Sequence, residues 1–366
     1  VDSHGAEPDR GDEDGERRED PANRSRKRAV RDRSLDLSNP RLAKRHDAIV
    51  AVCACACRRS VQSDVGQVYE LCAVYVERTV RRSPRSRNCE DNAHGSAGTS
   101  ARDYYHLGAA MKFGLSIEEA RRVNVEGTRT FVETAKRSQR LRRVIYVGGF
   151  KIGAQNARET IARAGGYERS KIEADDLVRA YEREGVPITR VQPGTIIGDS
   201  RTGESKQLWG FADLVRDLFH GKIPALVGDA SYWMPLMTVD FLARFIAGVP
   251  ELEGEVEGEH IVIDDATPPM IELVERITRH LGVPVVRRTV PKGALEWFLR
   301  IGGERLTGVS PEAVSFIGPE RYDVHATKRA MSAMGLEMPD IDLAVRRTVD
   351  HFLASRFGKR DVPRTH

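Results

Sequence analysis

Three short apolar segments, separated by stretches with helical periodicity, constrain what the middle of this chain can fold into. They cover residues 104–111, 143–147 and 188–192, and each ends in small residues, glycine or a Pro-Gly pair. The segments between them are long enough for one helix each. Strands that alternate with helices at this spacing predict an α/β protein with a parallel sheet and helices on its faces.

The first of these helices is marked by a capping box, in which Ser116 is followed three positions later by Glu119. Small and apolar side chains then recur at intervals of three and four residues, which predicts one buried face. These residues are Ala120, Val123, Gly127, Phe131 and Ala135. A glycine inside a helix is expected where the helix lies close against a sheet, so we predict such a contact at Gly127.

The second helix is predicted over residues 167–184 and contains Tyr167 and Lys171, which lie on the same side because they are four residues apart. An ammonium beside a phenol favours the phenolate, so a tyrosine in this pair can serve as an acid or base near neutral pH. Gly185 and Pro187 end the helix. Its buried face is formed by Ala174, Leu177, Val178 and Tyr181.

The composition, with 31% charged and 40% hydrophobic residues in 366, predicts a globular protein. The net charge of +4 is small and the basic residues share no periodic face, so no nucleic-acid partner is expected. The longest apolar run, 48–57, is too short to span a membrane, and the acidic start is unlike a secretory signal, so we predict a cytoplasmic protein. The five cysteines lie within 53–89 at spacings that predict no metal site.

The chain divides by composition into five parts. Residues 1–47 reverse from acidic to basic and predict a disordered charged arm. An irregular segment, 48–102, stands in place of the first strand–helix–strand units. The predicted sheet and the Tyr167 helix follow in 103–200. A mixed substrate-binding and C-terminal helical region covers 201–355, and a basic tail covers 356–366.

The order of the motifs resembles the extended short-chain dehydrogenase/reductase family, in its epimerase/dehydratase branch, over residues 103 to about 355. The motifs are His106-Leu107-Gly108-Ala109-Ala110 after the first strand, Val123-Asn124-Val125-Glu126-Gly127-Thr128, Ile145-Tyr146-Val147, Tyr167-x-x-x-Lys171 and Pro193-Gly194-x-x-x-Gly198. The resemblance implies a Rossmann-like, doubly wound parallel sheet, a smaller C-terminal substrate region and NAD or NADP as cofactor.

The resemblance also implies roles for individual residues. Tyr167 is expected to exchange a proton with a substrate oxygen, and Lys171 to bind the nicotinamide ribose and lower the Tyr167 pKa. Asn124 is expected to hold the active-site helix in place. The cofactor-binding residues would be Tyr167, Lys171, His106, Leu107, Gly108, Ala109, Ala110, Val147, Gly148, Pro193 and Gly194.

Two features depart from the family pattern. A serine or threonine is expected at the end of the strand before the tyrosine helix, but residues 147–150 read Val-Gly-Gly-Phe, which leaves Lys151 or Thr160 as substitutes. A glycine-rich turn for the pyrophosphate is expected near residues 35–55, yet no glycine lies between Gly15 and Gly66. We interpret residues 1–102 as foreign to the family, either an out-of-frame translation or a replacement domain, and expect weak cofactor binding.

Three functions fit these observations. The leading one is an NAD(P)-dependent oxidoreductase or epimerase/dehydratase, which transfers a hydride with Tyr167 as acid/base and takes a small-molecule substrate. A non-catalytic protein that binds a nucleotide or a partner is favoured by the two departures, and an interaction protein built on the charged arm is the third. A homodimer is left open. The candidate lining of the substrate pocket is Trp209, Phe211, Trp233 and Met234, with burial in an ordinary core as the alternative for each of them.

Overall fold

The computed structural model describes residues 49–50, 102–110, 115–153, 165–252, 258–303 and 316–359, with single residues at 305, 309 and 314. The chain divides into two compact units, Val1–His46 and Asp47–His366, and every described residue lies in the second. The charged arm 1–47, nearly all of 48–102 with its five cysteines, Thr160 and most of the tail 356–366 lie outside the described residues.

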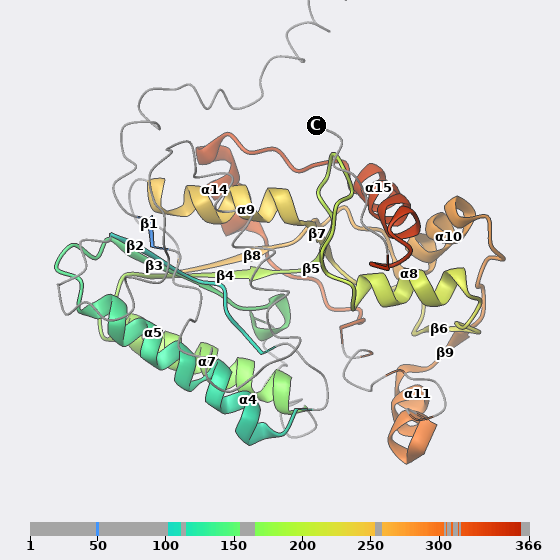
Figure 1. Ribbon diagram of the computed structural model, residues 1–366, viewed down its shortest axis with the longest axis horizontal. Helices are drawn as coiled ribbons and strands as arrows, with labels where there is room; N and C mark the ends of the chain where they lie inside the picture. Colours follow the sequence, from blue (N-terminus) through green and yellow to red (C-terminus); the bar gives the residue numbers. More distant parts are fainter. Residues whose placement is uncertain are drawn as a thin grey trace, which may run out of the picture. The chain divides into compact units, whose positions relative to one another are not determined.

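A parallel sheet forms the centre of the second unit (Figure 1). Its spatial order is β1-β2-β3-β4-β8, and every neighbouring pair is parallel. The strands are β1 (Ile49–Val50), β2 (Asp103–His106), β3 (Arg143–Val147), β4 (Ile188–Pro193) and β8 (Glu259–Val262). The predicted α/β sheet is therefore confirmed, and it includes one short strand from the segment interpreted as foreign.

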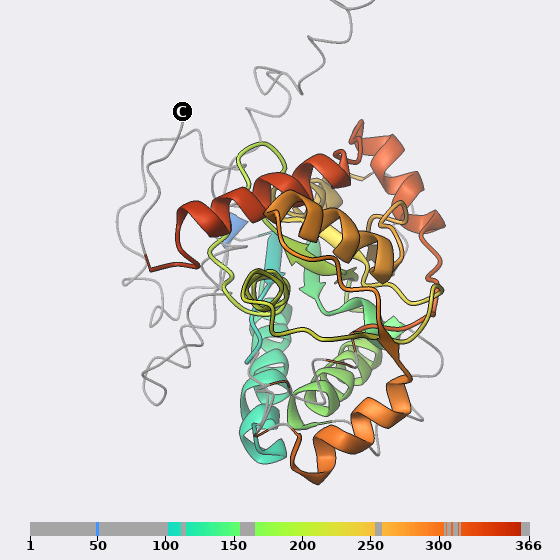
Figure 2. The same ribbon diagram turned by 90° about the vertical axis from the view of Figure 1, so that its right-hand side faces the viewer.

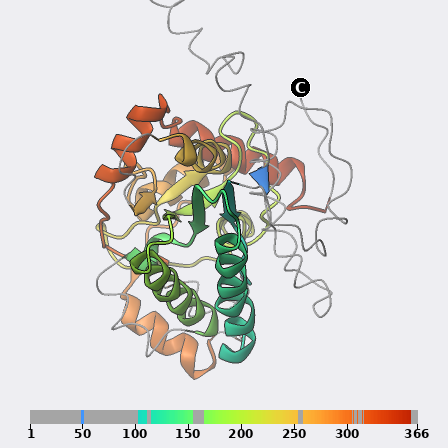
Figure 3. The ribbon, with the colours of Figure 1, turned by 90° about the vertical axis from the view of Figure 1, so that its left-hand side faces the viewer.

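Helices α4 (Ile117–Asn124), α5 (Glu126–Lys136) and α7 (Gly166–Arg183) cover one face of the sheet (Figures 1 and 3). Alternate strand residues point to this face, because successive side chains of a strand lie on opposite sides. The resulting core cluster includes Tyr104, Val144, Tyr146, Phe131, Val132, Ala135, Ala174, Val178, Tyr181 and Ile188.

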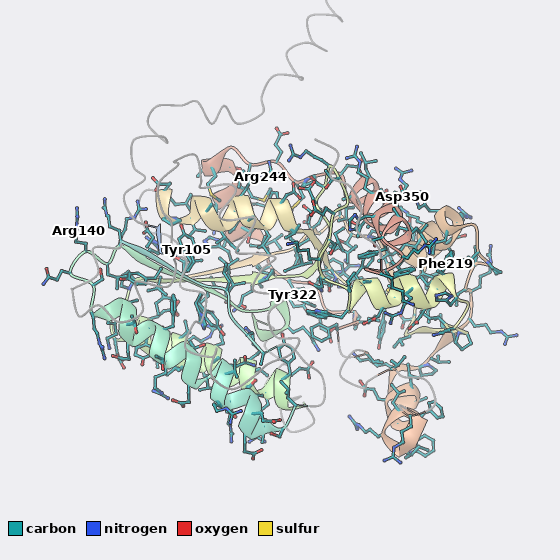
Figure 4. The ribbon with its side chains drawn as sticks, in the orientation of Figure 1. Tyr105, Arg140, Phe219, Arg244, Tyr322 and Asp350 are labelled. Carbon is teal, nitrogen blue, oxygen red and sulfur yellow. The ribbon has the colours of Figure 1, made fainter. Side chains whose placement is uncertain are left out.

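The opposite face is covered by α9 (Val239–Gly248) and α14 (His325–Met334). Tyr105, which alternates with Tyr104 along β2, packs on this side with the phenylalanines of α9 (Figure 4). A parallel sheet with helices on both faces has the doubly wound arrangement expected from the sequence.

The start of α4 and the end of α7 agree with the sequence pattern, but the predicted contact of Gly127 with the sheet is absent. Ser116 and Glu119 form the predicted capping box at the start of α4, and α7 ends at Arg183, just before Gly185. A Cβ added to Gly127 would meet no atom within 4 Å outside its own helix and neighbours. The predicted close approach of Gly127 to the sheet is therefore wrong.

The C-terminal region packs three helices around a second apolar core: α8 (Phe211–Phe219), α10 (Met270–Leu281) and α15 (Ile341–Ala354). Figure 2 shows α15 and α10 side by side. Two small parallel pairs join this region: β5 (Thr195–Ile197) with β7 (Leu236–Thr238), and β6 (Leu226–Val227) with β9 (Thr289–Val290). The remaining elements are η2 (Phe150–Gly153), η4 (Val249–Glu251), α11 (Lys292–Phe298) and η5 (Leu299–Gly303).

Among the described residues, no helix has the length and apolar character needed to cross a bilayer.

Candidate active site

The sequence-predicted residues meet at the carboxyl edge of the sheet, where ligands bind in open α/β folds. The loop 107–110 leaves β2 there, and the turn Gly148-Gly149 leaves β3. Helix α7 begins beyond this edge with Tyr167 in its first turn.

Asn124 connects the loop after β2 to the tyrosine helix. Its Oδ1 accepts a hydrogen bond from the Ala110 N–H at 2.7 Å, and its Nδ2 donates to the Ala110 carbonyl at 3.3 Å. The same Nδ2 donates to Ser170 Oγ at 2.8 Å, and this hydroxyl in turn donates to the Tyr167 carbonyl at 2.8 Å. Asn124 thus holds the first turn of α7 against the loop, and Ser170, which carried no sequence signal, completes the connection.

Tyr167 and Lys171 lie one turn apart on the buried side of α7, with 9% and 6% of their surfaces exposed. Lys171 Nζ donates to the Val147 carbonyl at 3.4 Å and lies 5.4 Å from the centre of the Tyr146 ring. Burial lowers the pKa of the Lys171 ammonium to about 8, against the opposing attraction of Asp175. The ammonium therefore lies at the carboxyl end of β3, and its lowered pKa means that it begins to lose its proton just above neutral pH.

His106 is a neutral imidazole beneath this site. Its Nε2 lies 2.8 Å from Thr128 Oγ1, and because that hydroxyl donates its only proton to the Asn124 carbonyl at 2.6 Å, Nε2 must carry the hydrogen. The ring stacks on Phe131 with 4.7 Å between centroids. Burial, together with the charge of Lys171, lowers the pKa of His106 to about 3. His106 supports the loop and the helix rather than acting as a base.

The turn after β3 is shaped by Gln192, a fully buried residue of β4. Its Oε1 accepts from the Gly149 N–H at 2.6 Å, while its Nε2 donates to Asp175 at 3.0 Å and to Glu259 at 3.2 Å. A Cβ at Gly148 would lie 2.0 Å from that Oε1. Only glycine fits at position 148 while Gln192 keeps this orientation, so the absent hydroxyl has no room there.

Ion pairs surround the Gln192 amide and fix it. Arg190, 5% exposed, lies within 2.6 Å of Glu259 and 3.0 Å of Glu182. Asp175 binds Arg179 at 2.7 Å. Acids and bases buried together satisfy one another's hydrogen-bonding groups, which a lone buried charge does not.

Pro193 and Gly194 lie at the end of β4, and the glycine is explained by packing. Its N–H donates to the Val262 carbonyl at 3.0 Å. A Cβ at Gly194 would lie 2.7 Å from the Pro235 carbonyl oxygen and 2.9 Å from Ile263. The close approach of these backbone segments accounts for the glycine at position 194.

The residues at this edge fit the nicotinamide end of a dinucleotide. Among the described residues the Lys171 ammonium, which has three donors, makes one long hydrogen bond, so it has donors left for ribose hydroxyls. The small residues Gly148 and Ala110 leave backbone rather than side chain at the edge. Lys171, the 107–110 loop and the turn after β3 are the groups that would hold it.

A small hollow with room for about one water molecule lies beside the turn after β3. Its lining is Phe150, Lys151, Trp233, Pro235, Phe316, Gly318, Glu320 and Tyr322. Of the four candidate pocket residues, Trp233 lines this hollow and is packed in an aromatic core cluster. Phe211 and Met234 are part of the C-terminal core, as the alternative account of these residues expected.

The parallel sheet with helices on both faces defines a Rossmann-like fold. The model of an NAD-binding family described as "Male sterility protein" matches residues 99–246. The match covers less than half of the chain, and it agrees with the resemblance of the motifs to extended short-chain dehydrogenases/reductases. A cofactor of NAD or NADP agrees with this family.

Several known proteins are similar to the chain. A subunit of linear gramicidin synthase from Brevibacillus parabrevis is 23% identical over 277 residues, a match that covers 68% of this chain and 5% of that protein. The terminal R domain of the myxalamid PKS-NRPS pathway superposes with a TM-score of 0.55 and 21% identity, covering 70% of this chain and 69% of that one. A thiolation-reductase di-domain from an archaeal non-ribosomal peptide synthetase gives 0.54 and 14%, covering 71% and 58%.

Proposed function

We propose that the chain is an NAD(P)H-dependent reductase of carbonyl compounds, with acyl thioesters as the substrate class. The observation that carries the proposal is the buried Lys171 ammonium at the carboxyl end of β3, one helical turn from Tyr167. The thioester class is supported by the similarity to a gramicidin synthase subunit, to a terminal R domain and to a thiolation-reductase di-domain.

Three side chains act in the proposed reaction: Tyr167, Lys171 and Asn124. Tyr167 gives its phenolic proton to the carbonyl oxygen as that oxygen becomes negative, and Lys171 favours the phenolate that remains. Asn124 keeps α7 in register with the loop through Ser170 and Ala110. The reduced nicotinamide, when bound, supplies the hydride.

The overall reaction balances for a thioester. The carbonyl carbon gains a hydride, the oxygen is transiently protonated, and the carbon–sulfur bond then breaks to release a thiol and an aldehyde. One proton and one reduced cofactor are consumed. A second round converts the aldehyde to an alcohol, with Tyr167 again giving the proton.

Fluorescence titration with NADH and NADPH, followed by turnover assays with benzoyl-coenzyme A and benzaldehyde, tests the proposal. Wild type is expected to bind one cofactor and to oxidise it when either compound is added. Tyr167→Phe is expected to bind the cofactor as wild type does but to turn over about 10²–10⁴-fold more slowly. An epimerase of the same family would return the hydride and show no net oxidation.

A non-catalytic, nucleotide- or partner-binding role is the second candidate. It is supported by residues 147–149, which carry no hydroxyl and have no room for one at position 148. Absence of saturable binding of either cofactor, or turnover unaffected by Tyr167→Phe, would reject the reductase proposal. A homodimer and a cytoplasmic location stay predictions.

A further inference from the structure

The ammonium of Lys171 is buried without an acid of its own. The residue is 6% exposed, and within the described residues it forms no ion pair and a single hydrogen bond, to the Val147 carbonyl at 3.4 Å. An opposing charge acts on it from Asp175, one turn further along α7. Asp175 also binds Arg179 at 2.7 Å and the Gln192 amide at 3.0 Å, so its charge is shared. A buried cation needs other groups to replace the water that it has lost.

The ring of Tyr146 lies under this ammonium. Lys171 Nζ is 5.4 Å from the ring centroid, which is within the range of a cation–π contact. Tyr146 belongs to β3, is 1% exposed, and is part of the core cluster between the sheet and α7. The face of an aromatic ring attracts a cation, and the attraction is stronger where water is excluded. Tyr146 therefore favours the charged form of Lys171.

The side chains on either side of Tyr146 do not supply a negative charge. His106 and Arg190 are its register partners in β2 and β4, so all three side chains point to the same face of the sheet. The His106 ring is 5.7 Å from that of Tyr146, and it is neutral because burial lowers its pKa to about 3. The charge of Arg190 is balanced by Glu182 at 3.0 Å and Glu259 at 2.6 Å. The titratable and charged groups that face Lys171 or this ring are thus His106 from β2, Arg190 from β4, and Tyr167 and Asp175 from α7.

The hydroxyl of Tyr146 takes no part in this contact. Its oxygen is buried and has no hydrogen-bond partner within the described part of the chain. Burial raises the pKa of this phenol well above its usual range, so it is neither an acid nor a base at the site. A buried hydroxyl without a partner lowers stability. The favourable contribution of Tyr146 therefore comes from its ring.

We propose that Tyr146 is a positioning residue for the reaction, whose ring holds the Lys171 ammonium in its charged form at the carboxyl end of β3. The proposal rests on the reductase function proposed above, in which that charge favours the phenolate of Tyr167. Tyr146 exchanges no proton and forms no bond to the substrate. Since the ring face acts and the hydroxyl does not, phenylalanine should serve at this position and an aliphatic side chain should not.

Titration of the Lys171 amine by NMR tests this role without cofactor or turnover. The protein carries isotope-labelled lysine side chains, and the Lys171 signal is the one that Lys171→Met lacks. In wild type it is expected to titrate near pH 8. Tyr146→Phe is expected to keep the pKa of Lys171 within about 0.3 of wild type, because the ring remains. Tyr146→Leu is expected to lower this pKa by about one unit, because the cation–π contact is lost.

Fluorinated phenylalanines at position 146 provide a test that keeps the packing. Fluorine withdraws electrons from the ring face while leaving the volume of the side chain nearly unchanged. Singly, doubly and triply fluorinated rings are therefore expected to lower the pKa of Lys171 stepwise. This series decides the question even where Tyr146→Leu does not fold.

Tyr104→Leu is the matched control for the loss of a buried ring. Tyr104 lies in the same core cluster, on the neighbouring strand β2, where its ring meets Phe131 edge to face at 6.3 Å. This variant is expected to lose stability as Tyr146→Leu does, because both leave space in the core. It should leave the pKa of Lys171 unchanged. A Lys171 pKa that does not respond to fluorination or to Tyr146→Leu, or that falls as far in Tyr104→Leu, would overturn the proposal.

The outcomes also distinguish this proposal from the one on which it rests. The pH at which turnover begins to fall should move down with the pKa of Lys171 in Tyr146→Leu and should stay in place in Tyr104→Leu. A chain in which the Lys171 pKa follows the ring, but which binds neither NADH nor NADPH, keeps the role of Tyr146 and loses the reductase function. A chain that oxidises NAD(P)H through Tyr167, with a Lys171 pKa independent of the ring, keeps the function and loses that role.

Discussion

The Asn124 amide donates to the Ser170 hydroxyl at 2.8 Å, a bond that spans 46 residues of sequence and holds α4 to the first turn of α7. Since Asn124 also binds both backbone groups of Ala110, one side chain fixes the relative positions of two segments of the candidate site. A displaced α7 would carry Tyr167 away from the sheet edge.

Asn124→Ala should therefore lower both stability and turnover. It leaves the buried Ala110 groups and the Ser170 hydroxyl without this partner, at a cost of roughly 2–4 kcal/mol in the free energy of unfolding. Thr130→Ala, which removes a hydroxyl bonded to the Glu126 carbonyl on the exposed side of α5, should change it by less than about 0.5 kcal/mol. Urea unfolding and cofactor-saturated turnover measure both effects, and equal losses in the two variants would contradict this role for Asn124.

The helices and sheet could be predicted from the sequence because periodicity and caps report local burial. The strand over 143–147 has the predicted bounds, and the helix predicted over 167–184 is α7, Gly166–Arg183. Helix α14 was missed because few apolar residues mark its buried face, and the three-residue strand β5 is too short for a pattern.

The candidate site was less predictable, because its connections join residues distant in sequence. Tyr167 and Lys171 are recognisable from their spacing. Gln192 was only part of an apolar strand pattern, and its contact with Gly149 depends on the register of β3 and β4. The glycine at 148 is explained by that contact, which no local rule contains.

The pKa of Lys171, lowered by burial to about 8, predicts an alkaline limit on activity. The ammonium is lost as pH rises through about 8, so turnover that depends on its charge should fall there. Lys171→Arg keeps its charge through this range, so its turnover should not fall there. The different shape of arginine lowers the rate overall. A pH–rate profile of both proteins checks this, and a profile of wild type that is flat through pH 8 would count against the role of the ammonium.

The lowered pKa of Lys171 also predicts that the free energy of unfolding rises with pH. The folded pKa lies below the ordinary value of 10.5, so the unfolded chain binds this proton more tightly. The penalty for burying the ammonium is fully present below pH 8 and is relieved as pH rises toward 10.5, by roughly 3 kcal/mol in total. Relative to Lys171→Met, wild type should gain stability over that window when both are unfolded with urea.

Two glycine-to-alanine substitutions should change the free energy of unfolding in opposite directions. At Gly148 a methyl group would overlap the Gln192 amide, so Gly148→Ala should cost about 1–3 kcal/mol and break the Gly149 hydrogen bond. At Gly127 the space is open, so Gly127→Ala should stabilise α5 by up to about 1 kcal/mol. Thermal unfolding of the pair measures both, and a stabilised Gly148→Ala would mean that Gln192 is free to move.

Asp175 should be far more important for stability than an exposed acid in a similar ion pair. It is 2% exposed and binds Arg179 at 2.7 Å and the Gln192 amide at 3.0 Å. Asp175→Ala leaves buried groups without their partner and should cost about 3–5 kcal/mol.

Glu126, paired with Arg129 at 3.2 Å with both side chains about half exposed, is the control for Asp175. Glu126→Ala should cost at most about 1 kcal/mol, because water screens the pair. Since Gln192 connects Asp175 to the turn after β3, Asp175→Ala should also loosen the Gly149 hydrogen bond, whereas Glu126→Ala should not. Urea unfolding measures both variants, and equal losses of stability would mean that burial does not make the Asp175 ion pair more important.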